Sequence, residues 1–155
     1  MILLDTSGIL AAIDASQRGH EAVRRALEDA EPPWALSPFV LAELDYLLAT
    51  RVGQNAQRAF LSEVGRGVYR LQSLDNEDIA SAERVIGRYR DLEIGLADAS
   101  LVVLATRYGV RDILTLDERH FRTLRGPGGR PFRLLPTDAY ARKAPQVLRS
   151  RPTKR

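Results

Sequence analysis

The sequence MILLDTSG, residues 1–8, decides the fold that we expect for the whole chain. Three large apolar residues in succession predict a short buried strand, which delivers Asp5 to its end. A carboxylate in that place is partly desolvated, which raises its pKa unless a cation or hydrogen-bond donors compensate. Asp5 therefore belongs either to a functional site or to the next helix, because Thr6 or Ser7 could use it as a cap.

Behind this strand, segments with strand and helix patterns alternate along the chain. Strands are expected at residues 1–4, 34–37, 68–71, 113–116 and 132–135. Helices are expected at residues 8–13, 20–31, 38–50, 53–65, 75–90 and 97–108. Parallel neighbours require helical crossovers, so the alternation predicts a three-layer α/β/α sandwich with a central, mainly parallel five-stranded sheet. Ligands of such sheets bind at the carboxyl ends of the strands.

The composition indicates one globular domain followed by a basic tail. A chain of 155 residues has the size of one domain, and 45% hydrophobic with 28% charged residues excludes a disordered or fibrous protein. We expect the domain at residues 1–140 and a flexible tail at residues 141–155. The basic residues of the tail are Arg142, Lys143, Arg149, Arg151, Lys154 and Arg155. The tail is either a solvated end or an arm that attracts nucleic-acid phosphates.

The residue types also restrict the compartment and the metal chemistry. No apolar run approaches the roughly 20 residues that span a bilayer, and the first residues lack the pattern of a secretory signal. We therefore expect a cytoplasmic protein without membrane contact. Zero cysteines exclude disulfides and thiolate metal sites. Only His20 and His120 could supply imidazole, so carboxylates are the expected ligands of any metal ion.

Two acids lie on helix faces that should otherwise be apolar. Glu43 lies in the middle of the helix predicted at residues 38–50 and falls within its apolar stripe, three residues after Val40. Asp98 heads the stripe of its own helix, since apolar residues follow it at i+3, i+4 and i+7. The helix dipole could also account for Asp98, which lies in the first turn, but not for Glu43.

A fourth acid, Asp117, follows the strand predicted at residues 113–116 as Asp5 follows the first strand. We expect these two acids to converge with Glu43 and Asp98 at one edge of the sheet. Two unit charges about 4 Å apart repel by about 4 kcal/mol at an effective dielectric near 20, so the cluster needs a counter-ion. Mg²⁺ or Mn²⁺ suits it, because these ions prefer oxygen ligands. Such a centre favours phosphodiester hydrolysis by a metal-activated water.

The four acids lie in short motifs that recur together in a known family. The motifs are Leu3-Leu4-Asp5-Thr6-Ser7, Leu41-Ala42-Glu43-Leu44, Leu96-Ala97-Asp98-Ala99-Ser100-Leu101 and Leu114-Thr115-Leu116-Asp117-Glu118-Arg119-His120-Phe121. In this order they resemble the PIN-domain ribonucleases, most closely the VapC toxins of bacterial toxin-antitoxin pairs. The resemblance runs from residue 1 to about residue 136.

The resemblance implies a hydrolase, a metal-dependent endoribonuclease whose four acids hold Mg²⁺ or Mn²⁺ and carry the catalysis. Asp5 and Asp98 match the most usual direct ligands, and the other two acids act directly or through water. Thr6 and Thr115 match hydroxyls that orient the carboxylates.

The resemblance also implies partners. Similar proteins form homodimers, and a small antitoxin protein that wraps the surface and reaches the acidic pocket keeps each of them inactive. Their substrate is RNA, including transfer, ribosomal or messenger RNA. The sequence names neither the RNA target nor the number of metal ions.

Two other functions compete with this interpretation. A haloacid-dehalogenase-like phosphatase also begins with a strand that ends in Asp, but it needs a second Asp where this chain has Ser7. A catalytically inactive PIN-like RNA-binding module would gain little from four repulsive carboxylates. His120 follows Asp117 by three residues and could be mistaken for a ligand, but we expect it to pack or lie on the surface.

Overall fold

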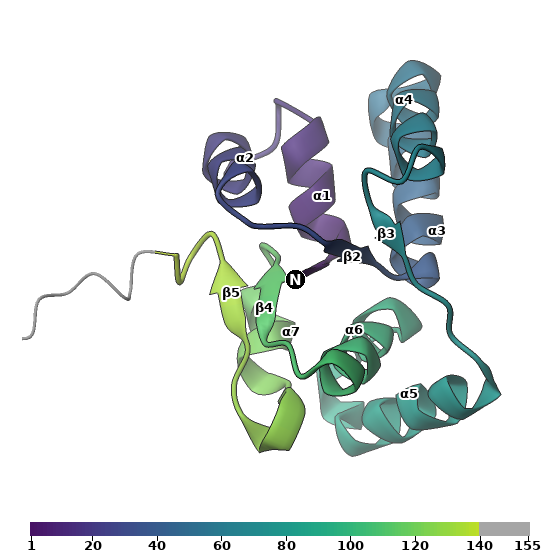
Figure 1. Cartoon of the computed structure of the whole chain (residues 1–155), viewed down its shortest axis with the longest axis vertical. Coiled ribbons are helices and arrows are strands. Elements are labelled where there is room, and N and C mark those ends of the chain that lie inside the picture. The colour runs from purple at the N-terminus through teal and green to yellow at the C-terminus, as the bar shows by residue number, and fades with distance from the viewer. Residues whose placement is uncertain (140–155) are drawn as a thin grey trace, which may run out of the picture.

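The computed structural model describes residues 1–139, which form a five-stranded parallel sheet between two layers of helices (Figure 1). Its strands are β1 (Ile2–Leu4), β2 (Trp34–Leu36), β3 (Arg70–Leu71), β4 (Asp112–Leu114) and β5 (Arg133–Leu135). Their order is β3-β2-β1-β4-β5, and every neighbouring pair is parallel. The predicted three-layer α/β/α sandwich is therefore confirmed.

Helices occupy all the crossovers between the strands. They are α1 (Thr6–Ile13), α2 (His20–Glu28), α3 (Pro38–Leu47), α4 (Gln54–Gly65), α5 (Asn76–Arg88), α6 (Leu96–Tyr108) and α7 (Glu118–Thr123). A π-helical turn, Leu48–Val52, extends α3, and 3₁₀ turns lie at Arg90–Leu92 and Pro127–Gly129. Figure 1 shows α1 to α4 on one side of the sheet and α5 to α7 on the other. This division follows from right-handed crossovers, because the chain reverses its direction across the sheet after β3.

The strands lie in the centre of the hydrophobic core. All three residues of β1 are buried, and Leu3 is in register with Ala35 of β2 and Ile113 of β4. Phe60 of α4 and Phe121 of α7 are the largest fully buried side chains. Because both faces of β1 are covered, its sequence reads as a continuous apolar run that ends only at Asp5.

Local sequence signals set several of the helix ends. Ser37 caps α3 by accepting a hydrogen bond from the Phe39 N–H, and Pro38 occupies the first turn. Asp75 and Asp78 form a capping box at the start of α5. Gly109 ends α6 in the left-handed conformation, with φ of 66°.

Several element bounds differ by one to three residues from those expected from the sequence, and the differences at α1 and β4 bear on the site. Helix α1 begins at Thr6 rather than at residue 8, because Asp5 caps it. Strand β4 ends at Leu114, two residues earlier than expected, and the chain then turns into α7, a short helix that the sequence pattern did not indicate. The cap of α7 is Asp117, whose side chain accepts a hydrogen bond from the His120 N–H.

Helix α1 crosses the end of β4 at very short range. A Cβ atom placed on Gly8 would lie 2.4 Å from the carbonyl oxygen of Leu114. Only glycine therefore allows this approach, which brings the first turn of α1 to the residues that follow β4.

Two expectations concern the chain as a whole. None of the helices within residues 1–139 has the length and hydropathy needed to cross a membrane. The basic tail expected at residues 141–155 lies outside the described residues, so the division into domain and tail stays a prediction.

Candidate active site

Asp5 is the most deeply buried of the four predicted acids, with an exposed fraction of 4%. Its Oδ2 atom accepts hydrogen bonds from the Ser7 N–H (3.3 Å), the Ser7 hydroxyl (2.6 Å) and the Thr115 hydroxyl (2.8 Å). Burial nevertheless raises the pKa of Asp5 to about 6, although these hydrogen bonds lower it, and the negative charge of Asp98 raises it further. The fold therefore holds this carboxylate in place without a cationic partner in the described residues.

A network of hydroxyl groups joins the ends of β1 and β4. The Oγ atom of Ser7 lies 3.2 Å from Oγ1 of Thr115 and accepts a hydrogen bond from the Leu116 N–H. The Thr115 hydroxyl also accepts a hydrogen bond from the Asp117 N–H, at 2.9 Å. The backbone that carries Asp117 is thus attached to the groups that hold Asp5.

Thr6 connects the end of β1 to helix α3. Its hydroxyl donates a hydrogen bond of 2.7 Å to Oε2 of Glu43. Both threonines that we expected to orient carboxylates therefore donate to one of the four acids, Thr6 to Glu43 and Thr115 to Asp5.

Asp98 lies in the first turn of α6, where its Oδ2 atom accepts a hydrogen bond of 3.4 Å from the Gly95 N–H. Burial raises the pKa of Asp98, and the negative charges of Asp117 and Glu43 raise it further, whereas His120 and the Gly95 N–H lower it. Asp98 thus interacts electrostatically with both Asp117 and Glu43, and Asp5 interacts in the same way with Asp98. The four acids come from four different elements at the carboxyl edge of the sheet, and Asp98 interacts with each of the other three.

His120 lies between two of these acids, so the expected packing or surface role is wrong. Its Nδ1 atom is 3.2 Å from Oδ2 of Asp98 and 3.0 Å from Oδ2 of Asp117. Nδ1 is buried and, within residues 1–139, forms no hydrogen bond with suitable angles. The imidazole therefore occupies a place between the carboxylates that a cation would also favour.

Glu43 is the acid whose environment differs most from our expectation. We placed it within a buried stripe of α3, but it is exposed, while Val40 and Leu44 on either side are buried. Its side chain reaches Thr6, directly after the end of β1, where the sheet no longer covers the helix. Asp45, two residues further along α3, is half-buried and accepts a hydrogen bond from Gln57.

Three of the acids also have a local structural role. Asp5 caps α1, Asp117 caps α7, and Asp98 accepts from the N–H that precedes α6. Capping explains each acid singly, since a carboxylate at a helix N-terminus is favourable. It does not explain why three such caps and the mid-helix Glu43 meet in one place.

The donor set suits a hard cation, although it is not a ready-made cage. Within residues 1–139, no group of three or more histidine or acidic side chains is arranged closely enough to hold an ion by itself. The charge of Asp98 raises the pKa of Asp5, and the charges of Asp117 and Glu43 raise the pKa of Asp98. No Arg or Lys of the described residues forms an ion pair with any of the four acids. Mg²⁺ commonly takes only one or two carboxylates and keeps several waters, so these residues fit it.

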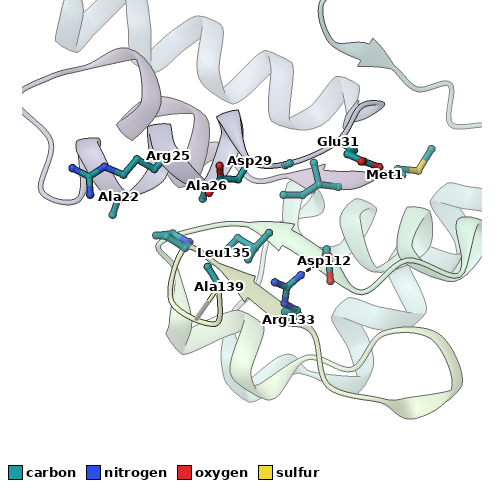
Figure 2. A pocket seen from close by; sticks show the side chains of 13 residues that line it. Met1, Ala22, Arg25, Ala26, Asp29, Glu31, Asp112, Arg133, Leu135 and Ala139 are labelled. Atoms are coloured by element: carbon teal, nitrogen blue, oxygen red, sulfur yellow. Dashed lines mark hydrogen bonds and ion pairs between the residues drawn. The ribbon is translucent and has the colours of Figure 1, made fainter. Parts of the chain in front are cut away.

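Away from the four acids, a cleft lies between α2 and the strands β4 and β5 (Figure 2). This cleft of about 570 Å³ is lined partly by Arg25, Asp29, Asp112 and Arg133, and none of the four predicted acids lines it. Figure 2 shows that Asp112 and Arg133 within it form an ion pair, at 2.8 Å. We therefore place the candidate site at the acids, where the charge remains uncompensated, rather than in this cleft.

Sequence reasoning missed two side chains of the site. Ser7 was considered only as a helix-cap partner, yet it donates to Asp5 and accepts from the chain after β4. His120 was set aside, although its position three residues after Asp117 places both on one side of α7. In each case the sequence offered one indication: Ser7 and His120 each follow, by two or three residues, an acid that precedes a helix.

The fold and site geometry can be set beside known proteins. Residues 2–126 match the model of the PIN domain family. Over 135 residues the chain is 45% identical to Ribonuclease VapC26 of Mycobacterium tuberculosis, which covers 87% of this chain and 100% of that protein.

Solved structures share the fold at lower identity. The crystal structure of VapC20 from Mycobacterium tuberculosis, a toxin that cleaves the sarcin-ricin loop, superposes with a TM-score of 0.72 at 23% identity and covers 77% of this chain and 92% of that one. FitAcB from Neisseria gonorrhoeae gives a TM-score of 0.60 at 21% identity, covering 78% and 91%. A toxin-antitoxin complex from Klebsiella pneumoniae gives 0.59 at 19%, covering 80% and 92%.

Proposed function

Because the chain belongs to the PIN domain family, we propose that it is a metal-dependent endoribonuclease and the toxin of a toxin-antitoxin pair. The observation that carries the proposal is the convergence of Asp5, Glu43, Asp98 and Asp117 at one sheet edge without a cationic partner among residues 1–139 other than His120. The identity of 45% to a ribonuclease over 87% of the chain supports RNA as the substrate.

The four acids would hold Mg²⁺ or Mn²⁺ in different ways. We assign Asp5 and Asp98 as direct ligands, and Glu43 and Asp117 as ligands that act directly or through water. When bound, the ion would lower the pKa of a water and stabilise negative charge on the phosphate that is attacked.

The chain's own residues would orient these ligands. Ser7 and Thr115 donate only to Oδ2 of Asp5, so we assign the other oxygen of this carboxylate to the ion. Thr6 holds Glu43 in the same way, and His120 keeps Asp98 and Asp117 at a fixed separation. Such supporting contacts commonly change metal affinity 10- to 100-fold.

We propose RNA cleavage with labelled transfer, ribosomal and messenger RNA as the test. The wild-type protein should cleave one of these RNAs with Mg²⁺ or Mn²⁺ and be inactive in EDTA. Asp5→Asn and Asp98→Asn should be inactive, because each removes a charged ligand but keeps the shape of the side chain. Asp29→Asn, at an exposed acid just after the end of α2, is the matched control and should keep full activity. Cleavage in EDTA, or by either site variant, would contradict the metal assignment.

The alternatives give different results in the same experiments. An inactive PIN-like module would bind RNA in Mg²⁺ without shortening it. A haloacid-dehalogenase-like phosphatase would release phosphate from small esters and leave RNA intact.

We also propose a small antitoxin partner and a homodimer. Support comes from exposed apolar side chains on consecutive elements from α3 to β3, namely Tyr46, Val52, Leu61, Val68 and Leu71. Tyr46 has an exposed fraction of 67%, which is unusual for a large aromatic residue unless a partner covers it. Co-expression with the neighbouring short reading frame should relieve toxicity. In size-exclusion chromatography, Tyr46→Glu should weaken the complex with the antitoxin or the homodimer, without reducing RNA cleavage.

A further inference from the structure

A second hollow, of about 260 Å³, lies where α5, α6 and the residues after α7 meet. Arg84 and Arg88 of α5 and Arg125 after α7 line it, and Val102 of α6 is buried beside them. Arg84 and Arg88 are one helical turn apart, so they extend from the same side of α5. We call this group of three arginines around an apolar wall the arginine pocket.

The charges of the arginine pocket are not neutralised by the fold. Among the described residues 1–139, none of its three arginines forms an ion pair. Other arginines of this protein do so, as Arg107 pairs with Asp78 and Arg133 with Asp112. Three positive charges gathered without acids repel one another, so a bound anion would be favourable here.

Two of the guanidinium groups are held in place by polar contacts that leave donors free. Arg84 donates from Nη2 to the Ser81 hydroxyl at 2.9 Å. Arg125 donates from Nη1 to the carbonyl oxygens of the three residues before it, at the end of α7, at 2.8 to 3.1 Å. Because guanidinium has five N–H donors, each group keeps several for a ligand.

The arginine pocket lies next to the acidic site along α6. Val102 is one turn after Asp98, a rise of ~6 Å along the helix axis. On the other side, His120 contacts Asp98 and Arg125 lies five residues further along the chain, beside Val102. A short connection joins the end of α5 to the start of α6, and Arg107, near the end of α6, pairs with Asp78, near the start of α5, as in an antiparallel helix pair. Counting nine residues back from Arg107 and nine forward from Asp78 brings Asp98 near the level of residue 87, next to Arg88.

We propose that the arginine pocket binds a backbone phosphate of the RNA strand, next to the phosphate that is cleaved at the acids. This rests on the proposed function, because RNA is the ligand that must present phosphates to both places. A planar guanidinium can donate two parallel hydrogen bonds to one phosphate, which a lysine cannot, and all three basic residues of the pocket are arginines. The pocket thus offsets the repulsion that the neighbouring carboxylates exert on an RNA strand.

The test measures RNA binding by the full chain in EDTA, where no cleavage is expected, by fluorescence anisotropy of a short labelled single-stranded RNA at several salt concentrations. Arg84→Ala and Arg88→Ala should each weaken binding about tenfold. The slope of log affinity against log salt should fall by about 0.7 for a lost phosphate contact. Arg88→Lys keeps the charge and should keep the slope while losing part of the affinity. With Mg²⁺, both alanine variants should raise KM and leave kcat unchanged.

Arg58→Ala is the matched control, because Arg58 is an exposed arginine of α4 without an ion pair among the described residues. The proposal is overturned if Arg84→Ala and Arg88→Ala bind RNA as Arg58→Ala does. It is also overturned if they lose affinity for the antitoxin alone, which would make the pocket a protein-docking site. Wild-type protein that binds RNA through the arginines but never cleaves it supports the pocket and contradicts the proposed function. Wild-type protein that cleaves RNA but binds it independently of these arginines supports the proposed function and contradicts the pocket.

Discussion

Asp5, which we propose as a metal ligand, is a residue whose burial as a charge is costly to the fold. Its pKa of about 6 lies above the ordinary value of 3.8, because burial disfavours its charge. The folded protein thus binds this proton more tightly than the unfolded chain does. The contribution of Asp5 to stability is fully present below about pH 4 and is lost as the pH rises through 6.

We predict that Asp5→Asn stabilises the metal-free protein at pH 7 while abolishing RNA cleavage. The gain should be at most about 3 kcal/mol in the free energy of unfolding, at about 1.4 kcal/mol per pH unit. Urea denaturation in EDTA at pH 4 and pH 7 measures it: the wild-type protein should lose stability between the two, and the variant should not. If the free energy of unfolding changed equally with pH in both proteins, the ionisation of Asp5 would not destabilise the fold.

Thr115 supports the site through its hydroxyl alone. We predict that Thr115→Val lowers the free energy of unfolding by about 1 to 3 kcal/mol, because the Asp117 N–H loses its acceptor and Asp5 loses a donor. Thr123→Val is the control, since that hydroxyl is exposed and donates only to the Arg119 carbonyl. Chemical denaturation of the two variants should separate them; similar losses would mean that the hydroxyl network contributes little.

At the scale of elements, the close contact between α1 and β4 gives a sharp comparison of two glycines. Gly8→Ala should destabilise the protein by about 2 to 3 kcal/mol, because its Cβ would meet the Leu114 carbonyl at 2.4 Å and the backbone must move. Gly87→Ala, within α5, should stabilise it by about 0.5 to 1 kcal/mol, since the nearest atom is a flexible Glu83 oxygen at 4.0 Å. Thermal unfolding would refute this contrast if both variants shifted in the same direction.

The sequence predicted elements better than their surroundings. The apolar run before Asp5, the Ser37-Pro38 cap and the Gly109 stop are local signals, and each predicted an element that the structure contains. The exposure of Glu43 and the place of His120 depend on where other elements end, which no local pattern records. Helix α7 was missed because its signal is a single capping acid.

At the scale of the whole molecule, charge is divided unevenly between residues 1–140, the expected domain, and residues 141–155, the expected tail. The six basic residues of 141–155 leave 17 Arg and Lys against 20 Asp and Glu in residues 1–140, a net charge of −3. The domain by itself would therefore repel RNA, apart from local groups such as the arginine pocket. We predict that a chain ending at residue 140 binds RNA more weakly at low salt and approaches the full chain at high salt. Anisotropy titrations measure this, with kcat as the quantity that should remain unchanged.

Metal binding should also appear as stability of the whole domain. We predict that Mg²⁺ raises the melting temperature of the wild-type protein. At a Mg²⁺ concentration of 100 times Kd, the free energy of unfolding should increase by about 2.7 kcal/mol. Asp98→Asn should not respond, although it remains folded. Calorimetry with and without Mg²⁺ measures both, and an equal response in the variant would place the ion elsewhere.

The position of β4 in the sheet has a consequence for protein synthesis. This strand lies beside β1 in the middle of the sheet, yet it is translated after most of the other elements. A nascent chain that ends at residue 111 contains three of the four acids but leaves β1 open on one side and lacks the hydroxyl of Thr115. Under the proposed function, such a chain cannot cleave RNA while it is still on the ribosome, and prematurely terminated products are harmless to the cell that makes them.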